Sequence, residues 1–257
     1  MTGERSSVVD RNGTPAWEFF PAGHRRPDGL PTLVTDPRQL ETPLLRRILG
    51  ILREEYDPGF VFRWMGPVPF TPLASRAGSR VALIGTGGLH LKGDVPFDPE
   101  SNRWGDTGFR VIPHLTPPED LDLAAAHLDP RYIPRDPEVA LPMRALAHWV
   151  DAGGVGSAAP RHFSFCEGVV RPFPGLVASI REVAVRLRED QVDAALVFPT
   201  CSLCVLNACI IARELEAGGI STVAVTPLPE LSAIVGLPRA QPVGFPLGAP
   251  AGNPDAL

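Results

Sequence analysis

The sequence predicts an α/β fold, a three-layer sandwich built on a mainly parallel sheet, with a proline-rich extension at its N-terminal side. Short apolar runs typical of buried strands occur at residues 80–85, 193–198 and 221–226. Segments with apolar residues at helical spacing lie between them and after them. Strands and helices that alternate in this way imply right-handed crossovers and a parallel sheet. In such sheets, ligands bind beyond the carboxyl ends of the strands.

The N-terminal part of the chain lacks this order. The chain has 30 prolines in 257 residues, and those within residues 1–40 stand in a stretch without periodicity, so we expect an extended arm packed on the body or on a partner. A helix is predicted at residues 42–55, where apolar residues recur at helical spacing, namely Leu44, Leu45, Ile48 and Leu52. We therefore divide the chain into an arm with a short helix, residues 1–75, and an α/β domain, residues 76–257.

The predicted α/β domain begins with the strand at 80–85, which ends at a glycine. A long loop follows at residues 86–118, and loops of this length in compact domains are usually functional. The remaining helices are predicted at 138–151, 174–189, 202–217 and 230–235, with an edge strand at 241–245. Because the loops after the strands at 80–85 and 193–198 both leave carboxyl ends, we expect them to face the same ligand-binding edge.

The composition excludes several classes of function. A net charge of −5 and a pI of about 5.7 give no basic footprint for nucleic acid. No segment approaches the roughly 20 apolar residues of a membrane helix, and the polar N-terminal stretch does not resemble a signal peptide. We therefore expect a cytoplasmic protein with neither nucleic-acid nor membrane partners. There, its four cysteines indicate reactive or metal-binding thiols rather than a disulfide framework.

The strongest chemical element is the segment from Cys201 to Cys204, between a predicted strand and a predicted helix. Cys201 falls at the helix start, where unpaired N–H groups and the helix dipole stabilise an anion and lower the pKa of a thiol. Cys204 comes one turn later on the same face, within disulfide reach, so the pair can act as attacking and resolving thiols. The alternative is a tight strand–helix junction holding two small buried residues.

A metal site is the other alternative for these two sulfurs. A structural zinc ion needs four ligands, so Cys166, Cys209 or a histidine such as His90 would have to complete the set. Cys209 lies mid-helix among apolar residues and is better explained as part of the core. We therefore expect a redox-active dithiol without an obligatory cofactor, and a bound metal ion is the alternative.

A second polar group follows the first predicted strand. Gly87 and Gly88 allow backbone N–H groups to approach an anionic ligand closely, although neither a dinucleotide-binding fingerprint nor a phosphate-binding loop is present. His90 is a candidate general acid, with Asp106 either orienting it or pairing with Arg110. The alternative is that these polar residues only structure the loop.

A third polar group occupies residues 161–168, where polar and aromatic residues alternate as at the end of a strand. His162 and Glu167 are candidates to face the ligand, and the alternative for His162 is a hydrogen-bonded structural histidine. His127 is a similar candidate. The other histidines are interpreted as structural or surface residues, namely His24, His114 and His148.

Taken in chain order, these pieces resemble the selenoprotein B family of glycine, sarcosine, betaine and D-proline reductases. The matching stretches are 81–92 (VALIGTGGLHLK), 105–113 (GDTGFRVIP), 162–168 and 201–222 (CSLCVLNACIIARELEAGGIST), together with His127, 142–156, 238–239 and 245–248. They extend over residues 75–252, and the co-linear set is much more specific than any one motif.

This resemblance implies an oxidoreductase that cleaves a carbon–nitrogen bond reductively, with Cys201 as the attacking residue and Cys204 as the resolving thiol. Characterised members of the family carry selenocysteine where this chain has cysteine, and many are longer. Their pyruvoyl-bearing subunit would be another chain, so the resemblance also implies a second subunit as a partner.

Three functions remain open. The first is a thiol-dependent reductase or lyase for a small anionic, amino-acid-like molecule, in which Arg110 or Arg239 holds a carboxylate. A thioredoxin-like or small-thiol reductant would restore the dithiol, and we expect a homo-oligomer. The second is a metal-dependent enzyme or metal-binding protein, and the third is a non-catalytic subunit whose arm docks a partner. A cofactor-free racemase, with Cys166 facing Cys201, is a relative of the first.

Overall fold

The computed structural model describes residues 33–34, 42–63, 65–67, 70–98, 104–126, 128–168, 170–171 and 173–252. The predicted proline-rich arm, residues 1–40, therefore lies outside the described residues apart from two, and so does His127. Residue contacts divide the chain into two compact units. One comprises Met1–Val68 with Ala233–Gly236, and the other Pro69–Ser232 with Leu237–Leu257. The predicted domain boundary between residues 75 and 76 stays a prediction.

The first unit contains the predicted short helix. α1 (Pro43–Ile51) continues into a π-helical turn, η2 (Leu52–Tyr56), so the helix expected at 42–55 is confirmed. The Thr42 hydroxyl accepts a hydrogen bond from the N–H of Leu45 at 3.4 Å, as a helix N-cap does. Two short strands, β1 (Leu33–Val34) and β2 (Phe62–Arg63), pair antiparallel in the same unit.

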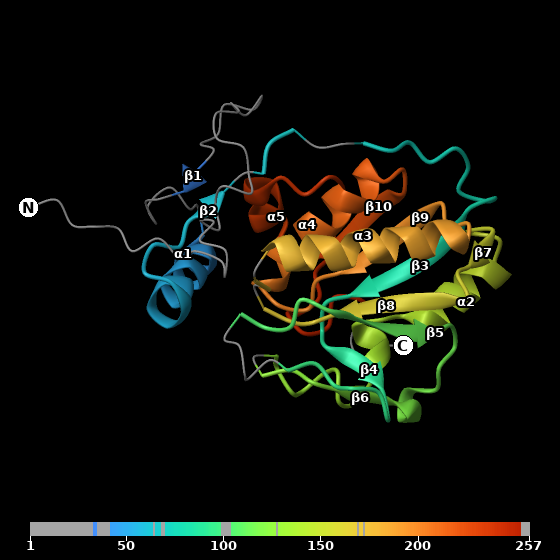
Figure 1. The fold of residues 1–257 in the computed structure, drawn as a ribbon, viewed down its shortest axis with the longest axis horizontal. Helices are drawn as coiled ribbons and strands as arrows, with labels where there is room; N and C mark the ends of the chain where they lie inside the picture. Colours follow the sequence, from blue (N-terminus) through green and yellow to red (C-terminus); the bar gives the residue numbers. More distant parts are fainter. Residues whose placement is uncertain are drawn as a thin grey trace, which may run out of the picture. The chain divides into compact units, whose positions relative to one another are not determined.

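A mainly parallel sheet forms the centre of the second unit (Figure 1). Its strands are β3 (Arg80–Gly85), β5 (Phe109–Pro113), β7 (Ser157–Ala158), β8 (Arg161–Phe165), β9 (Ala194–Phe198), β10 (Ser221–Thr226) and β11 (Ala240–Pro242). They follow the order β11-β10-β9-β3-β8-β5, with β7 beside β3. Every pair is parallel except β5 with β8. The predicted α/β class is therefore confirmed.

Helices flank this sheet. α3 (Phe173–Glu189) and α4 (Cys204–Ala217) are the successive crossovers from β8 to β9 and from β9 to β10, and right-handed crossovers in one direction place both on the same face. α2 (Met143–Asp151) shares a buried core with Val81 and Leu83, alternate residues of β3. α5 (Pro229–Val235) precedes β11. No helix within the described ranges combines the length and apolar character needed to cross a bilayer.

The stretch predicted as a loop, residues 86–118, contains further structure. β4 (Leu89–Leu91) pairs antiparallel with β6 (Leu121–Leu123), which follows a single 3-10 turn, η3 (Pro118–Asp120). β5 lies within the same stretch and pairs with β8, about 50 residues further along the chain. These strands depend on distant partners, so a local apolar pattern does not reveal them.

Two helices begin later than predicted. Instead of one helix over residues 138–151, a 3-10 turn, η4 (Pro137–Val139), precedes α2, because Pro142 interrupts the hydrogen-bonding pattern. The buried Glu138 carboxylate accepts from the N–H of Arg144 at 2.8 Å, in the first turn of α2. Likewise, α4 begins at Cys204 rather than at residue 202, so Cys201 precedes the helix.

Candidate functional site

The carboxyl ends of three neighbouring strands, β9, β3 and β8, meet at one edge of the sheet. The chain enters the sheet at β3, adds β5, β7 and β8 on one side, and then crosses to add β9 on the other. This reversal is the topological switch point at which open α/β sheets bind their ligands. Thr86, Cys166 and Pro199 are the first residues after the three strands, so the two loops expected to face one edge do so.

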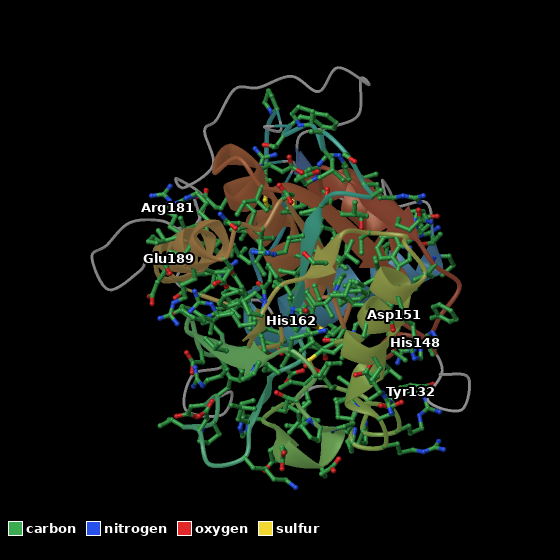
Figure 2. The ribbon with its side chains drawn as sticks, turned by 90° about the vertical axis from the view of Figure 1, so that its right-hand side faces the viewer. Tyr132, His148, Asp151, His162, Arg181 and Glu189 are labelled. Atoms are coloured by element: carbon green, nitrogen blue, oxygen red, sulfur yellow. A yellow bond between two sulfur atoms is a disulfide. The ribbon has the colours of Figure 1, made fainter. Side chains whose placement is uncertain are left out.

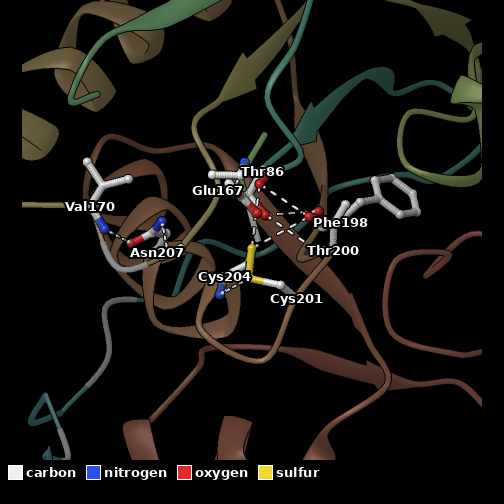
Figure 3. Close-up of a disulfide and its surroundings, with 10 residues drawn as sticks. Thr86, Glu167, Val170, Phe198, Thr200, Cys201, Cys204 and Asn207 are labelled. Atoms are coloured by element: carbon white, nitrogen blue, oxygen red, sulfur yellow. Dashed lines mark hydrogen bonds between the residues drawn. A yellow bond between two sulfur atoms is a disulfide. The ribbon is translucent and has the colours of Figure 1, made fainter. Parts of the chain in front are cut away.

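Cys201 and Cys204 follow β9 at this edge and form a disulfide with Cα atoms 4.9 Å apart (Figure 3). Cys201 keeps partial exposure, whereas Cys204 is completely buried. The N–H of Cys204 points at Cys201 Sγ, 3.0 Å away. Cys201 Sγ thus accepts from the N–H of the first residue of α4, in the turn that precedes the helix. In the reduced state this contact favours a negative charge on Cys201.

Two buried threonines surround the sulfur of Cys204 (Figure 3). Thr86 follows β3, and its carbonyl oxygen lies 3.6 Å from Cys204 Sγ. Thr200 follows β9, and its hydroxyl oxygen lies 3.5 Å from the same sulfur. The Thr200 hydroxyl also donates to the Thr86 carbonyl at 3.2 Å. The buried thiol position is therefore lined by hydrogen-bonding groups from two strand ends.

The two glycines after β3 have different structural requirements. Gly88 has a φ of +75°, and a Cβ atom there would collide with the carbonyl oxygen of Ala124. The N–H of Gly88 donates to the carbonyl of Phe165 at 3.0 Å, which ties this turn to the end of β8. A Cβ atom on Gly87 would lie 3.1 Å from the methyl group of Thr200. Gly87 thus allows the loop to pack against Thr200, and Gly88 allows it to pack against Ala124. A ligand role for both glycines stays a prediction.

The segment after β8 is the third segment at this edge of the sheet, besides those after β3 and β9. Cys166 is completely buried, and burial raises the pKa of its thiol to about 11. The Glu167 carboxylate, 4% exposed, accepts from the N–H of Ala126 and is drawn among the surroundings of the disulfide in Figure 3. Gly105 crosses over this segment, since a Cβ atom there would lie 3.2 Å from Cys166 Sγ. Glu167 therefore lies at the predicted edge, and its role in facing a ligand stays a prediction.

The Asn207 side chain joins the segment after β8 to α4, the helix that carries Cys204, through two hydrogen bonds. It is fully buried in α4, donates to the carbonyl of Gly168 at 2.6 Å and accepts from the N–H of Val170 at 3.1 Å (Figure 3). Asn207, Thr86 and Thr200 were not among the site residues predicted from the sequence. One signal was available, because an amide in an apolar helix, three residues after Cys204, needs buried partners.

Asp106 and Arg110 pair with each other, the second of the two arrangements predicted for Asp106. Arg110 Nη2 lies 3.1 Å from the carboxylate, which also accepts from the N–H of Gly108. The guanidinium donates to the carbonyls of Val95 and Pro96, and lies 4.2 Å from the ring centre of Phe97. These contacts structure the loop before β5, and a role for Arg110 in holding a substrate carboxylate stays a prediction.

His90 lies in β4 and is 5% exposed. Its Nδ1 lies 2.9 Å from the carbonyl of Leu91. Because a carbonyl only accepts, this bond places a proton on Nδ1 and leaves the lone pair of the neutral ring on Nε2. Among the described residues no hydrogen bond joins His90 to Asp106, so the predicted orienting contact is not formed in this state.

His162 lies within the sheet rather than beyond its edge (Figure 2). It is completely buried, its Nδ1 accepts from the N–H of Leu83 at 3.1 Å, and its Nε2 lies 2.9 Å from Nδ1 of His114. Burial lowers the pKa of His162 to about 3, with a further lowering from His114. The contacts match the structural alternative stated for this residue, while its role as a ligand residue stays a prediction.

Arg239 is engaged on the amino-terminal side of the sheet. It pairs with the fully buried side chain of Glu216 and donates to the carbonyl of Thr222, the second residue of β10. It also donates to the carbonyl of Thr71 and stacks on Phe70. Since the dithiol lies beyond the carboxyl end of the adjacent strand, the structure does not bring Arg239 together with Cys201.

The metal alternative rests on the two sulfurs alone. Within the described part of the chain, no three His, Cys, Asp or Glu side chains are grouped so that they could hold a metal ion. Cys209 is buried in α4, as expected for a core residue, and burial raises the pKa of its thiol to about 12.

Curated relatives decide the family of this chain. Over 175 residues it is 30% identical to the D-proline reductase subunit gamma of Acetoanaerobium sticklandii, an alignment that covers 68% of this chain and 71% of the relative. The chain belongs to the selenoprotein B family. The resemblance inferred from the motifs is thereby confirmed.

More distant selenoprotein B relatives are subunits of related reductases. The betaine reductase complex component B subunit beta of Peptoclostridium acidaminophilum is 24% identical over 98% of this chain and 56% of its own length. The glycine reductase complex component B subunit gamma of Symbiobacterium thermophilum is 27% identical over 73% of this chain and 44% of its own. The chain thus spans about half the length of these two relatives. No family model and no solved structure matches it.

Proposed function

We propose that this chain is the thiol-bearing subunit of a reductase complex that cleaves a carbon–heteroatom bond of a small anionic, amino-acid-like molecule. The observation that carries the proposal is the asymmetry of the dithiol. Cys201 is partly exposed and its sulfur accepts an N–H at 3.0 Å, whereas Cys204 is completely buried. An exposed thiol with a stabilised anion suits attack, and a buried neighbour suits resolution. The relatives, named as reductases of D-proline, betaine and glycine, support this class of reaction.

The reaction proceeds in two steps that together transfer two electrons. The Cys201 thiolate forms a bond to the substrate carbon, and the heteroatom leaves with the bonding pair and takes up a proton. The Cys204 thiolate then attacks Cys201 Sγ, the sulfur–carbon bond breaks, and the carbon keeps the pair and takes a proton from water. The disulfide that results is reduced by a thioredoxin-like protein or a small dithiol, which is itself oxidised.

The surrounding residues keep the proposed roles that the sequence suggested. His90 is the proposed proton donor to the leaving heteroatom, which requires its Nε2 to be protonated because Nδ1 is bonded to Leu91. Arg110 is the proposed carboxylate partner at the carboxyl edge, where a substrate would compete with Asp106 for the guanidinium. Glu167 and the backbone of Gly87 and Gly88 complete the proposed substrate surface.

Iodoacetate provides a direct test, because it is a small anion with a carbon–heteroatom bond. The full-length reduced chain is treated with iodoacetate over a range of pH, and modified residues are identified by mass spectrometry. We expect Cys201 to react first, with a kinetic pKa below the roughly 8.5 of a free thiol. Cys201→Ser should abolish this fast reaction, whereas Cys204→Ser should retain it. Cys209→Ser is the matched control, since its thiol is buried.

Two results would contradict the assignment. One is a Cys201 that titrates like a free thiol, and the other is a fast reaction that survives in Cys201→Ser. A stoichiometric metal that disappears in the Cys201→Ser/Cys204→Ser double variant would favour the metal alternative instead. The same reagents also test the subunit alternative, because a complex with its partner that keeps full activity with Cys201→Ser would make this chain non-catalytic.

A further inference from the structure

We propose that the hydroxyl group of Thr200 takes part in the chemistry of the dithiol as a catalytic group. Its hydrogen bond is donated to the Thr86 carbonyl while the disulfide is present, and to the Cys204 sulfur when the disulfide opens. The inference rests on the proposed function, because it concerns the state in which Cys204 is the resolving or leaving thiolate. It adds to that function the hydrogen-bond donor that a fully buried thiolate requires.

The position of the Thr200 hydroxyl oxygen carries the argument. It lies 3.2 Å from the carbonyl oxygen of Thr86 and 3.5 Å from Cys204 Sγ. A rotation about the Cβ–Oγ1 bond therefore redirects the hydroxyl proton from one acceptor to the other. In the disulfide, sulfur is a weak acceptor and the carbonyl is the better partner. When Cys204 becomes a thiolate, the charged sulfur becomes the stronger acceptor.

The rest of the Thr200 residue is held in place, so the exchange needs no movement of heavy atoms. The Thr200 N–H donates to the hydroxyl of Thr86 at 3.4 Å, and its carbonyl accepts from the N–H of Gly248 at 2.6 Å. The methyl group of Thr200 faces Gly87, where even one added carbon would lie 3.1 Å away. The side chain is thus wedged by its methyl group with its hydroxyl facing the sulfur.

The surroundings of Cys204 make such a donor necessary. Its sulfur is completely buried, and the Thr86 carbonyl at 3.6 Å is an acceptor that suits a thiol but not a thiolate. The carboxyl group of Glu167, after β8, is also drawn nearby, and in its ionised form it would disfavour a second anion. The first turn of α4 and the Thr200 hydroxyl are the groups that favour the charged sulfur.

A chromogenic aromatic disulfide, dithio-bis-nitrobenzoate, separates the two thiol steps without any substrate. Cys201 thiolate attacks one sulfur of the reagent, forms a mixed disulfide and releases one coloured nitrothiobenzoate. Cys204 then loses its proton to solvent and attacks Cys201 Sγ, which forms the protein disulfide and releases the second nitrothiobenzoate. The dithiol is oxidised by two electrons, and the reagent is reduced to two thiolates.

The decisive variants are Thr200→Val, which keeps the methyl group and loses the hydroxyl, and Thr200→Ser, which does the reverse. We expect Thr200→Val to slow the second release by about tenfold at neutral pH and to move its pH midpoint up by about one unit, while the first release stays unchanged. Thr200→Ser should retain the rate and midpoint of the unsubstituted chain. Thr226→Val is the matched control, because it removes another buried threonine hydroxyl, at the end of β10.

The outcomes separate the two proposals. An unsubstituted chain that releases only one equivalent, as Cys204→Ser must, overturns the proposed function itself. Two equivalents, with the same second rate in Thr200→Val and the unsubstituted chain, overturn only the role of Thr200. The Cys201→Ser/Cys204→Ser variant supplies the baseline from the remaining thiols. If Thr200→Val does not fold, Thr200→Ala replaces it, and equal second rates in Thr200→Ala and Thr200→Ser overturn the inference.

Discussion

At the scale of single residues, the buried histidine of β8 shows how a side chain can complete a sheet. β7 and β8 both pair with β3, but the backbone pairing along β3 is interrupted between them, at Leu83. His162 fills this interruption, because its ring nitrogen accepts the N–H of Leu83 in place of a strand carbonyl. Since Nδ1 accepts, Nε2 carries the proton and donates to Nδ1 of His114. The neutral ring is thus built into the backbone hydrogen bonding of the sheet.

This arrangement predicts a stability that falls at acidic pH. The pKa of His162 is lowered to about 3 in the folded chain, so below pH 6.5 the unfolded chain binds a proton that the folded chain does not. The free energy of unfolding should therefore drop as the pH falls from about 6.5 toward 3, by about 2 kcal/mol for this residue between pH 7 and pH 5. His162→Gln keeps an acceptor for Leu83 but cannot titrate, so its pH dependence should be shallower.

Urea unfolding at pH 7 and pH 5 measures this difference. His148→Gln is the matched control, because it removes an exposed histidine from α2 (Figure 2). An equally steep pH dependence in His162→Gln and the unsubstituted chain would show that the titration of His162 is not what lowers the stability. His114, whose pKa is also lowered by burial, would then be the next residue to substitute.

At the scale of elements, the turn between β3 and β4 depends on a close approach of two backbone segments. Gly88 adopts a φ of +75°, its carbonyl accepts the N–H of Ala124 at 3.1 Å, and a Cβ atom would collide with the Ala124 carbonyl. Gly153, after α2, has a similar φ of +69° but nothing within 4 Å of the added carbon. An alanine substitution would therefore cause backbone strain alone at Gly153, and both strain and a steric collision at Gly88.

Gly153→Ala should therefore lower the free energy of unfolding by about 1 kcal/mol, the cost of a left-handed conformation. Gly88→Ala should lower it by about 3 kcal/mol, since the collision adds to the strain. Chemical denaturation of both variants tests the comparison. Equal losses would mean that the loop yields to the added carbon, and the close approach of this turn to Ala124 would not depend on Gly88.

The strands and helices also show which local sequence patterns are sufficient to predict an element. The strands at 80–85, 193–198 and 221–226 were predictable because both faces of a central parallel strand are largely buried. Apart from Arg80 and Asp193, which begin the first two, every residue is apolar or small. β4 and β5 were not, because they form only where β6 and β8 supply their partners. The start of α4 was misplaced by two residues because residues 201–203 form a turn before the helix, with Leu203 at the N-cap position and no side chain capping the helix.

At the scale of the whole molecule, the topology assembles the site from segments that the sequence separates by more than one hundred residues. Thr86 and Thr200 share two hydrogen bonds across 114 residues because β3 and β9 are adjacent. The edge that carries the dithiol could be predicted from the alternation of strands and helices, which implies a parallel sheet. Most of its lining could not, because the positions of the Thr200 and Asn207 side chains depend on contacts between distant segments.

Arg239 illustrates the same limit and carries the last prediction. Its place near the end of the chain gave no sign of the partner that the fold supplies, the fully buried Glu216 carboxylate of α4. That pair, together with the carbonyls of Thr71 and Thr222, joins three distant segments of the second unit. Its removal would leave a buried carboxylate without its cation.

Arg239→Met should therefore lower the free energy of unfolding by about 3 kcal/mol or more, and adding Glu216→Gln should recover part of the loss, because the neutral amide needs no cation. The rate at which iodoacetate reacts with Cys201 in the Arg239→Met variant should not change, when it is measured under conditions where this variant remains folded. Arg110→Met is the comparison, since this arginine lies at the carboxyl edge and should lower that rate with a smaller loss of stability. A stable Arg239→Met chain that reacts slowly with iodoacetate would instead assign the substrate carboxylate to Arg239.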